Sequence, residues 1–237
     1  ILLLFNLCYR EVNHSPLFKE SSFLNRNYDS GFRGGLAILI VFHHISKYYD
    51  GDLIKEGGAY GMVVVGLFFF FSGYGLIHSR NQKENYMDGF LRKRLSGILV
   101  PFYFCSVIFV GFALIMQLPM STMEVVAYLS GWCLINTHMW YIVEIAFLYL
   151  SFFVIFRLVK NTKVGIALMG IVITALIVAS MLSGHGPECA SDMWLQGEWW
   201  FNTTYMFLAG MLLAEYEAGV IDFVKKHYAV LLVIFLL

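Results

Sequence analysis

Long apolar runs, separated by short polar connections, dominate the sequence. The runs fall at about 32–49, 60–79, 97–117, 139–156, 164–183 and 199–216, and a last one begins near residue 228. A helix needs about 20 mainly apolar residues to cross the hydrocarbon core of a bilayer. The pattern therefore predicts an all-α protein, a polytopic bundle of transmembrane helices with about seven spans present.

Residues 121–137 interrupt this pattern, because a short apolar stretch stands there between polar ends. Such a run is too short to span a bilayer. If it does not cross, all sixteen Lys and Arg residues except Lys47 and Lys55 lie on the cytoplasmic side, as the positive-inside rule requires. We therefore expect a re-entrant or interfacial segment near 121–137 on the outer side, and a cytoplasmic basic loop at 80–94.

Both ends of the sequence look cut. The chain starts at Ile1 without a methionine and closes inside the last apolar run. We therefore expect a fragment in which a polar juxtamembrane segment, residues 1–30, precedes a transmembrane domain at 31–237.

The composition agrees with a membrane protein, since 59% of the residues are hydrophobic and only 14% are charged. That apolar fraction excludes an ordinary soluble domain. A net charge of zero gives no electrostatic case for nucleic acid as a partner. The four cysteines form no CxxC pair and show no metal-ligand spacing with histidine, so we expect neither a redox motif nor a metal site.

Arg33 and His44 place a permanent cation and an imidazole on one predicted helix. The eleven residues from one to the other span roughly 16 Å and bring both side chains to within about 20° of one helical face. His43 points about 80° away, which makes His44 the better partner for whatever Arg33 binds. An ionisable group inside a membrane helix is by default a functional-site hypothesis. The alternative is a histidine that hydrogen-bonds a neighbouring helix.

Four stretches carry motifs. In the first, Arg33 is followed by ten residues and then His44, and the second is Phe-Phe-Ser-Gly-Tyr within Gly66–Leu76. The third is a basic group before Pro101 within Phe90–Tyr103. The fourth is a glutamate in the apolar run Trp140–Tyr149. In this order they resemble the integral-membrane acyltransferase-3 family of O-acyltransferases, which modify bacterial surface polysaccharides and related glycans. The fold of that family has roughly ten helices, so this chain would lack the last few.

The resemblance implies an enzyme that moves an acyl group, most often acetyl, from cytoplasmic acyl-CoA to a hydroxyl of a cell-surface or lipid-linked glycan. Such O-acetylation modifies polysaccharides of the cell envelope. The protein would be a multi-pass protein of the cytoplasmic (inner) membrane, with acyl-CoA, the acceptor glycan and membrane lipids as partners. Acyl-CoA would act as the donor substrate, and no bound cofactor is expected.

The candidate residues suit this chemistry. A neutral imidazole can take the proton of a hydroxyl that attacks a thioester, and His44 is the candidate base with His43 as the substitute. Glu144 could orient a histidine or bind a sugar hydroxyl. Because CoA carries phosphates, fixed cations should bind it, and the candidates are Arg33, Arg92, Lys93 and Arg94. The last three would serve equally well as a positive-inside anchor.

Three further residues are candidates for substrate binding. Ser72, beside Gly73, would let an acyl chain approach closely, although small residues serve helix packing equally well. Tyr74 and Trp140 could line the path of the acceptor, with aromatic packing as the alternative.

A membrane transporter or flippase of lipid-linked glycans is the alternative function. Buried ionisable residues such as Arg33, His44 and Glu144 also form proton or substrate paths. A non-catalytic membrane sensor is a third alternative. Transfer of an acyl group would distinguish the enzyme from both.

Overall fold

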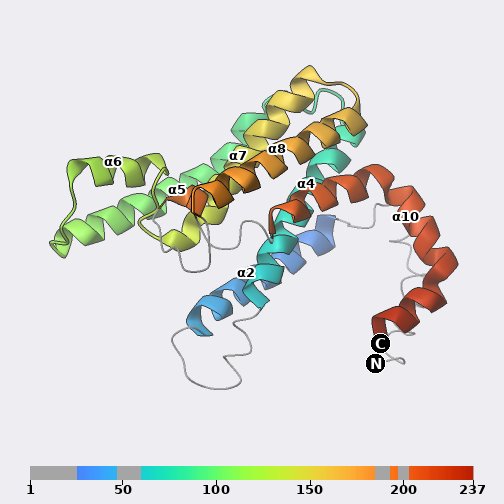
Figure 1. The fold of residues 1–237 in the computed structure, drawn as a ribbon, viewed down its shortest axis with the longest axis horizontal. Helices are drawn as coiled ribbons and strands as arrows, with labels where there is room; N and C mark the ends of the chain where they lie inside the picture. The colour runs from blue at the N-terminus through green and yellow to red at the C-terminus, as the bar shows by residue number, and fades with distance from the viewer. Residues whose placement is uncertain (1–25, 47–59, 185–192, 197–202, 237) are drawn as a thin grey trace. The chain divides into compact units, whose positions relative to one another are not determined.

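The computed structural model describes residues 26–46, 60–184, 193–196 and 203–236 (Figure 1). The chain forms two compact units, Ile1–Val64 and Val65–Leu237. Most of the predicted juxtamembrane segment, residues 1–30, lies outside the described residues, as do the predicted end of the first span at 47–49 and the predicted start of another at 199–202.

Helices make up the regular structure of the described residues, apart from one isolated bridge between Cys133 and Met193. Four helical segments there are long and apolar enough to cross a membrane, and Phe32–Ser46 is a shorter apolar helical stretch. The prediction of an all-α membrane helix bundle is confirmed. In the described ranges the α-helices are α2 (Arg26–Ser46), α4 (Gly61–Gln82), α5 (Phe90–Ile115), α6 (Thr122–Ser130), α7 (Trp140–Leu158), α8 (Thr162–Leu182) and α10 (Tyr205–Leu236), and the 3₁₀ helices are η3 (Thr137–Met139) and η4 (Trp194–Gln196).

In the second unit, α4 and α7 end where α5 and α8 begin. Arg80, at the end of α4, donates to the hydroxyl of Thr162 at the start of α8 (2.7 Å) and lies over the ring of Phe156 near the end of α7. Phe90, at the start of α5, stacks on Phe152 near the end of α7, with ring centroids 5.5 Å apart. The basic residues of this end, Arg80, Lys83, Arg92, Lys93, Arg94, Arg157, Lys160 and Lys163, thus belong to one side, as the predicted topology requires.

Residues 121–137 return along α5 instead of crossing. Their helix, α6, has nine residues and a length of about 14 Å, which is less than half the thickness of the hydrocarbon core. α6 packs against α5 (Figure 1). A Cβ added to Gly131, just after α6, would lie 3.4 Å from the ring of Phe102 in the middle of α5. The structure therefore agrees with the predicted segment that does not span.

A capping box fixes the start of α6. The backbone N–H and the hydroxyl of Ser121 donate to the carboxylate of Glu124, whose own N–H donates to the Ser121 hydroxyl. These hydrogen bonds lower the pKa of the Glu124 carboxyl, the backbone bond contributing most. The start of α6 is therefore stabilised by hydrogen bonds within its own first turn.

α10 (Tyr205–Leu236) consists of helical stretches joined at kinks. Non-helical angles at Tyr216 (φ −110°, ψ 15°) and His227 (φ −111°, ψ 16°) separate these stretches. The kinks lie where the sequence predicts the end of one apolar run, near 216, and the start of the next, near 228. The residues between the kinks include charged ones and are helical, and no proline stands among them.

The basic loop predicted at 80–94 is shorter than expected. α5 begins at Phe90 rather than near 97, and the residue before it, Gly89, adopts φ 68°, a conformation that favours glycine. The connection between α4 and α5 is therefore 83–89. As a result, Arg92, Lys93 and Arg94 lie in the first turns of a helix.

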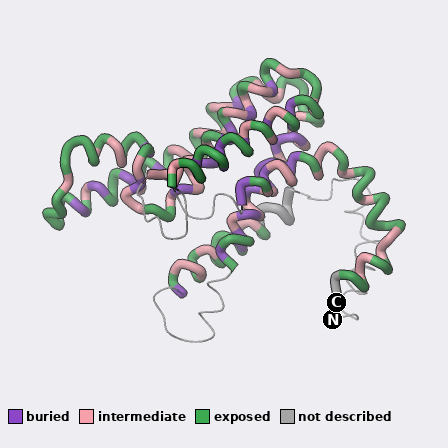
Figure 2. The backbone as a smooth tube through the Cα atoms, in the orientation of Figure 1, coloured by how far each residue is buried: buried purple, intermediate pink, exposed green. Residues whose placement is uncertain are grey.

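α7 and α8 supply the middle of the core, and each buries one stripe of side chains at helical spacing (Figure 2). α5 instead exposes large apolar side chains, among them Val100 (66%), Phe104 (67%) and Ile115 (77%). Such a surface suits contact with lipid rather than water. The buried stripes include Trp140, Glu144, Ile145, Leu148, Tyr149, Phe152 and Phe156 on α7, and Ile166, Met169, Ile173, Leu176, Ile177 and Ser180 on α8.

α4 and α10 touch backbone to backbone. A Cβ added to Gly73 would overlap the carbonyl oxygen of Phe207, and one added to Gly210 would overlap that of Phe70. Each helix thus presents a glycine where the other needs space, as in close helix pairs within membranes.

We expect Gly73→Ala to push α4 away from α10, because its methyl group has no room beside the Phe207 backbone. The cost should be at least that of overpacking a core, about 1–3 kcal/mol. Gly75→Ala is the matched control, since the space around its Cβ position is open, and it should be neutral or stabilising. Thermal unfolding in detergent checks both variants, and equal melting temperatures would contradict the described contact.

We expect cysteines at Ser121 and His138 to react from the same side of the membrane, and a cysteine at Gln82 to react from the opposite side. All three positions are at least partly exposed. The measurement is labelling by a membrane-impermeant maleimide in intact cells and in inverted vesicles, with the native cysteines replaced by serine. Labelling of Ser121→Cys and His138→Cys from opposite sides would mean that the segment crosses.

Candidate functional site

Three of the predicted site residues, Arg33, His43 and His44, lie on α2 in the first unit, and all three are half-buried. α2 is helical throughout Arg26–Ser46. The geometry expected from the spacing therefore holds, with Arg33 and His44 on one face and about 16 Å apart along the axis.

His43 packs against the start of α4 within the first unit. A Cβ added to Gly61 would lie 2.6 Å from its ring, and the ring meets that of His44 edge to face, with centroids 5.1 Å apart. Ser46 donates to the His43 carbonyl oxygen at 2.7 Å. Nδ1 of His43 is buried and finds no hydrogen-bond partner among the described residues. Packing therefore determines how this ring is oriented.

Glu144 is fully buried in the second unit, one turn into α7. Its Oε1 accepts a short hydrogen bond from the hydroxyl of Thr204, a residue that is also fully buried and directly precedes α10. Its Oε2 has no hydrogen-bond partner among the described residues. A buried polar atom left in this state costs about 1–3 kcal/mol, so it requires a functional or structural explanation.

Aromatic rings surround the start of α7. Phe69 of α4 lies 4.8 Å from the ring of Tyr141 and 6.4 Å from that of Trp140, between centroids. Trp140 stands one helical turn before Glu144 and is 8% exposed. The carboxyl group and these rings therefore form one group near the end of the unit that lies away from the basic residues.

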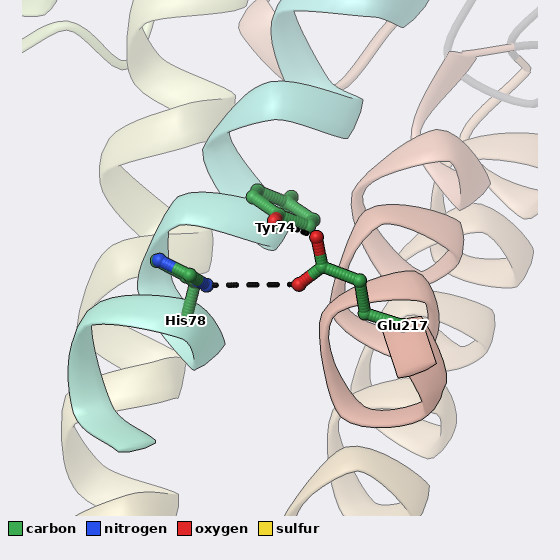
Figure 3. Close-up of polar contacts among 3 residues, drawn as sticks. All are labelled: Tyr74, His78 and Glu217. Carbon is green, nitrogen blue, oxygen red and sulfur yellow. Dashed lines mark hydrogen bonds and ion pairs between the residues drawn. The ribbon is translucent and has the colours of Figure 1, made fainter. Parts of the chain in front are cut away.

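Tyr74 belongs to a second polar cluster, which links α4 to α10 (Figure 3). Its hydroxyl donates to Oε1 of Glu217 at 2.9 Å, and Nδ1 of His78 lies 3.9 Å from Oε2 of the same carboxylate. The rings of Tyr74 and His78, one helical turn apart, stack with an interplanar angle of 14°. Glu217 follows the kink at Tyr216. This cluster lies about 20 Å along α10 from Thr204, so it is distinct from the Glu144 group.

The predicted phosphate-binding cations differ in their surroundings. Arg92 and Lys93 are exposed on the first turns of α5. Arg94 is half-buried and donates to the hydroxyl of Tyr86 at 3.0 Å. Arg80, which the sequence does not single out, donates to Thr162 and to the carbonyl oxygen of Lys160 (2.8 Å), and so ties α4 to α8.

Ser72 is buried, 8% exposed, beside the contact that Gly73 makes with α10. Its position fits the helix-packing interpretation of these small residues. No three His, Cys, Asp or Glu residues of the described chain come together as metal ligands.

The structure thus brings Trp140 together with Glu144, while Tyr74 joins a separate cluster and the histidines belong to the other unit. Sequence reasoning misses Thr204, Glu217 and the role of His78. The four-residue spacing of Tyr74 and His78 is visible as a shared helix face, but no sequence pattern pairs them with a residue 143 positions away from Tyr74.

The model of the acyltransferase-3 family, described as an acyltransferase domain, matches residues 27–237. The match runs from the second residue of α2 to the end of the chain. It agrees with the resemblance carried by the four sequence motifs. No curated protein and no solved structure matches the chain.

We expect Tyr74→Phe and Glu217→Gln to be energetically coupled, because one hydrogen bond joins the two side chains. A double-mutant cycle on the free energy of unfolding in mixed micelles should give a coupling of about 1 kcal/mol or more. Tyr103→Phe, which removes the hydroxyl of a tyrosine exposed on α5, is the control and should show no coupling with Glu217→Gln. Additive effects of Tyr74→Phe and Glu217→Gln would argue against the bond.

Proposed function

The chain belongs to the acyltransferase-3 family, and we propose that this membrane acyltransferase moves an acyl group, acetyl in the first instance, from cytoplasmic acyl-CoA to a hydroxyl of a cell-surface or lipid-linked glycan. The observation that carries the proposal is the family match over residues 27–237. Its helices make the chain a multi-pass membrane protein, and we place its work in the cytoplasmic membrane of the cell envelope.

The distribution of polar groups in the second unit supports an acyl donor and an acceptor glycan that bind from opposite sides of the membrane. The basic residues gather where α4 and α7 end, and positive charge marks the cytoplasmic side. Glu144 and its aromatic neighbours lie near the start of α7, toward the other side. A protein arranged in this way can accept a cytoplasmic thioester and an external hydroxyl.

Arg92 and Lys93 are the cations best suited to the phosphates of CoA, since both side chains are exposed on the proposed cytoplasmic side. Arg94 would be less available to bind a phosphate, because its guanidinium group already donates to the hydroxyl of Tyr86. Arg33, at the start of the apolar part of α2, is the candidate cation that the first unit supplies.

His44 is the proposed general base. It takes the proton of the acceptor hydroxyl while the hydroxyl oxygen attacks the thioester carbonyl carbon. The new C–O bond forms, the C–S bond breaks, and the proton passes to the departing thiolate of CoA. Base catalysis of this kind contributes about 10² to 10⁴ in rate. The tight contact of the His43 ring with Gly61 constrains that ring, which supports His44 rather than His43 as the base.

Glu144, Trp140 and the neighbouring rings suit an acceptor glycan, because carboxylates accept hydrogen bonds from sugar hydroxyls while aromatic rings pack on the apolar faces of sugars. The hydroxyl of Tyr74 already donates to Glu217, which supports a packing role for Tyr74. Ser72 lies beside the contact that Gly73 makes with α10, which supports a packing role for Ser72 as well.

We expect His44→Ala to lower acetyl transfer by about 10² to 10⁴, and His43→Ala, the matched control, to lower it far less. The measurement follows label from acetyl-CoA into envelope glycans, in membranes that contain equal amounts of folded protein. Transfer that survives in His44→Ala would remove the proposed base. A wild-type protein that transfers no label to any glycan fraction would instead favour the transporter.

A further inference from the structure

The unexplained feature of the Glu144 group is its asymmetry. One carboxyl oxygen, Oε1, is held by the hydroxyl of Thr204, whereas Oε2 is buried without a hydrogen-bond partner among the described residues. A purely structural carboxyl group would gain from partners on both oxygens, because each unmade bond in the interior costs free energy. The arrangement instead holds the carboxyl plane in place through Oε1 and leaves Oε2 available for a ligand.

Thr204 is well suited to hold that plane. Its side chain is fully buried, and a β-branched residue has little χ1 freedom. Its backbone is also anchored, since its carbonyl oxygen accepts from the N–H of Phe207 at 3.0 Å, and the backbone of Phe207 lies against Gly73. The hydroxyl is therefore fixed by the same contact that joins α10 to α4.

The surroundings indicate what Oε2 would bind. Trp140 stands one turn away on α7, and Phe69 and Tyr141 pack beside it. An uncharged hydroxyl is the partner that a carboxyl oxygen can take in such an apolar place without a second charge. The basic residues of the unit lie at the other end, so a phosphate is a poor fit here.

We propose that Thr204 is a positioning residue that orients Glu144, so that Oε2 accepts a hydrogen bond from a hydroxyl of the acceptor substrate. This inference rests on the proposed acyl transfer to a glycan, and it adds the residue that sets the geometry of acceptor binding. Thr204 itself does not touch the acceptor.

Two substitutions separate the hydrogen bond from the shape of the side chain. Thr204→Val keeps the volume and removes the hydroxyl, whereas Thr204→Ser keeps the hydroxyl. Thr204→Ser is the matched control, because it keeps the hydroxyl that donates to Glu144.

The experiment measures transfer of label from acetyl-CoA to an envelope glycan fraction, per folded molecule, while each substrate is varied. We expect Thr204→Val to lower the rate of acetyl transfer roughly tenfold, which is the effect of losing one hydrogen bond. The loss should appear in the series in which the glycan concentration is varied. The KM for acetyl-CoA should not change, and Thr204→Ser should stay within about threefold of the wild type.

Three results would overturn the inference. Thr204→Val that transfers like the wild type would leave the hydroxyl without a role in acceptor binding. A loss that Thr204→Ser does not restore, or one that raises the KM for acetyl-CoA equally, would mean a general structural effect. A wild-type protein that transfers no label would defeat the proposed function itself and this role with it, whereas the first two results leave that function intact.

Discussion

The close contact of α4 with α10, made at Gly73 and Gly210, is the constraint on which the second unit depends. Because the two backbones touch, the start of α10 is fixed beside α4, and α8 packs against α10 in turn. Two polar groups use this contact. Thr204, directly before α10, reaches Glu144 on α7, and Glu217 reaches Tyr74 farther along α10.

The two polar groups differ in what they leave available. In the Tyr74 cluster both carboxylate oxygens of Glu217 face a partner, a hydroxyl at 2.9 Å and an imidazole nitrogen at 3.9 Å. In the Glu144 group one oxygen has a partner within the described chain and the other has none. The first arrangement suits a link between helices, and the second suits a ligand.

The sequence alone predicts the helical fold and the non-spanning segment at 121–137, because length, hydropathy and charge bias are local properties. The family comes instead from the resemblance of four short motifs. The sequence also predicts that Arg33 and His44 share a face, which the unbroken α2 supports. It also predicts boundaries near 216 and 228, where Tyr216 and His227 kink α10. The sequence does not predict the hydrogen bond of Thr204, since its partner on α7 is 60 residues away and only packing brings the two together.

The early start of α5 has an electrostatic consequence. A helix begins with unpaired N–H groups and a partial positive charge, so acidic residues are favoured in its first turn and basic ones are not. The first turn of α5 holds no acidic residue, and Arg92, Lys93 and Arg94 crowd its start. Backbone and side chains therefore add their positive potentials at one place. Any anion that binds there would relieve that repulsion and stabilise the start of α5.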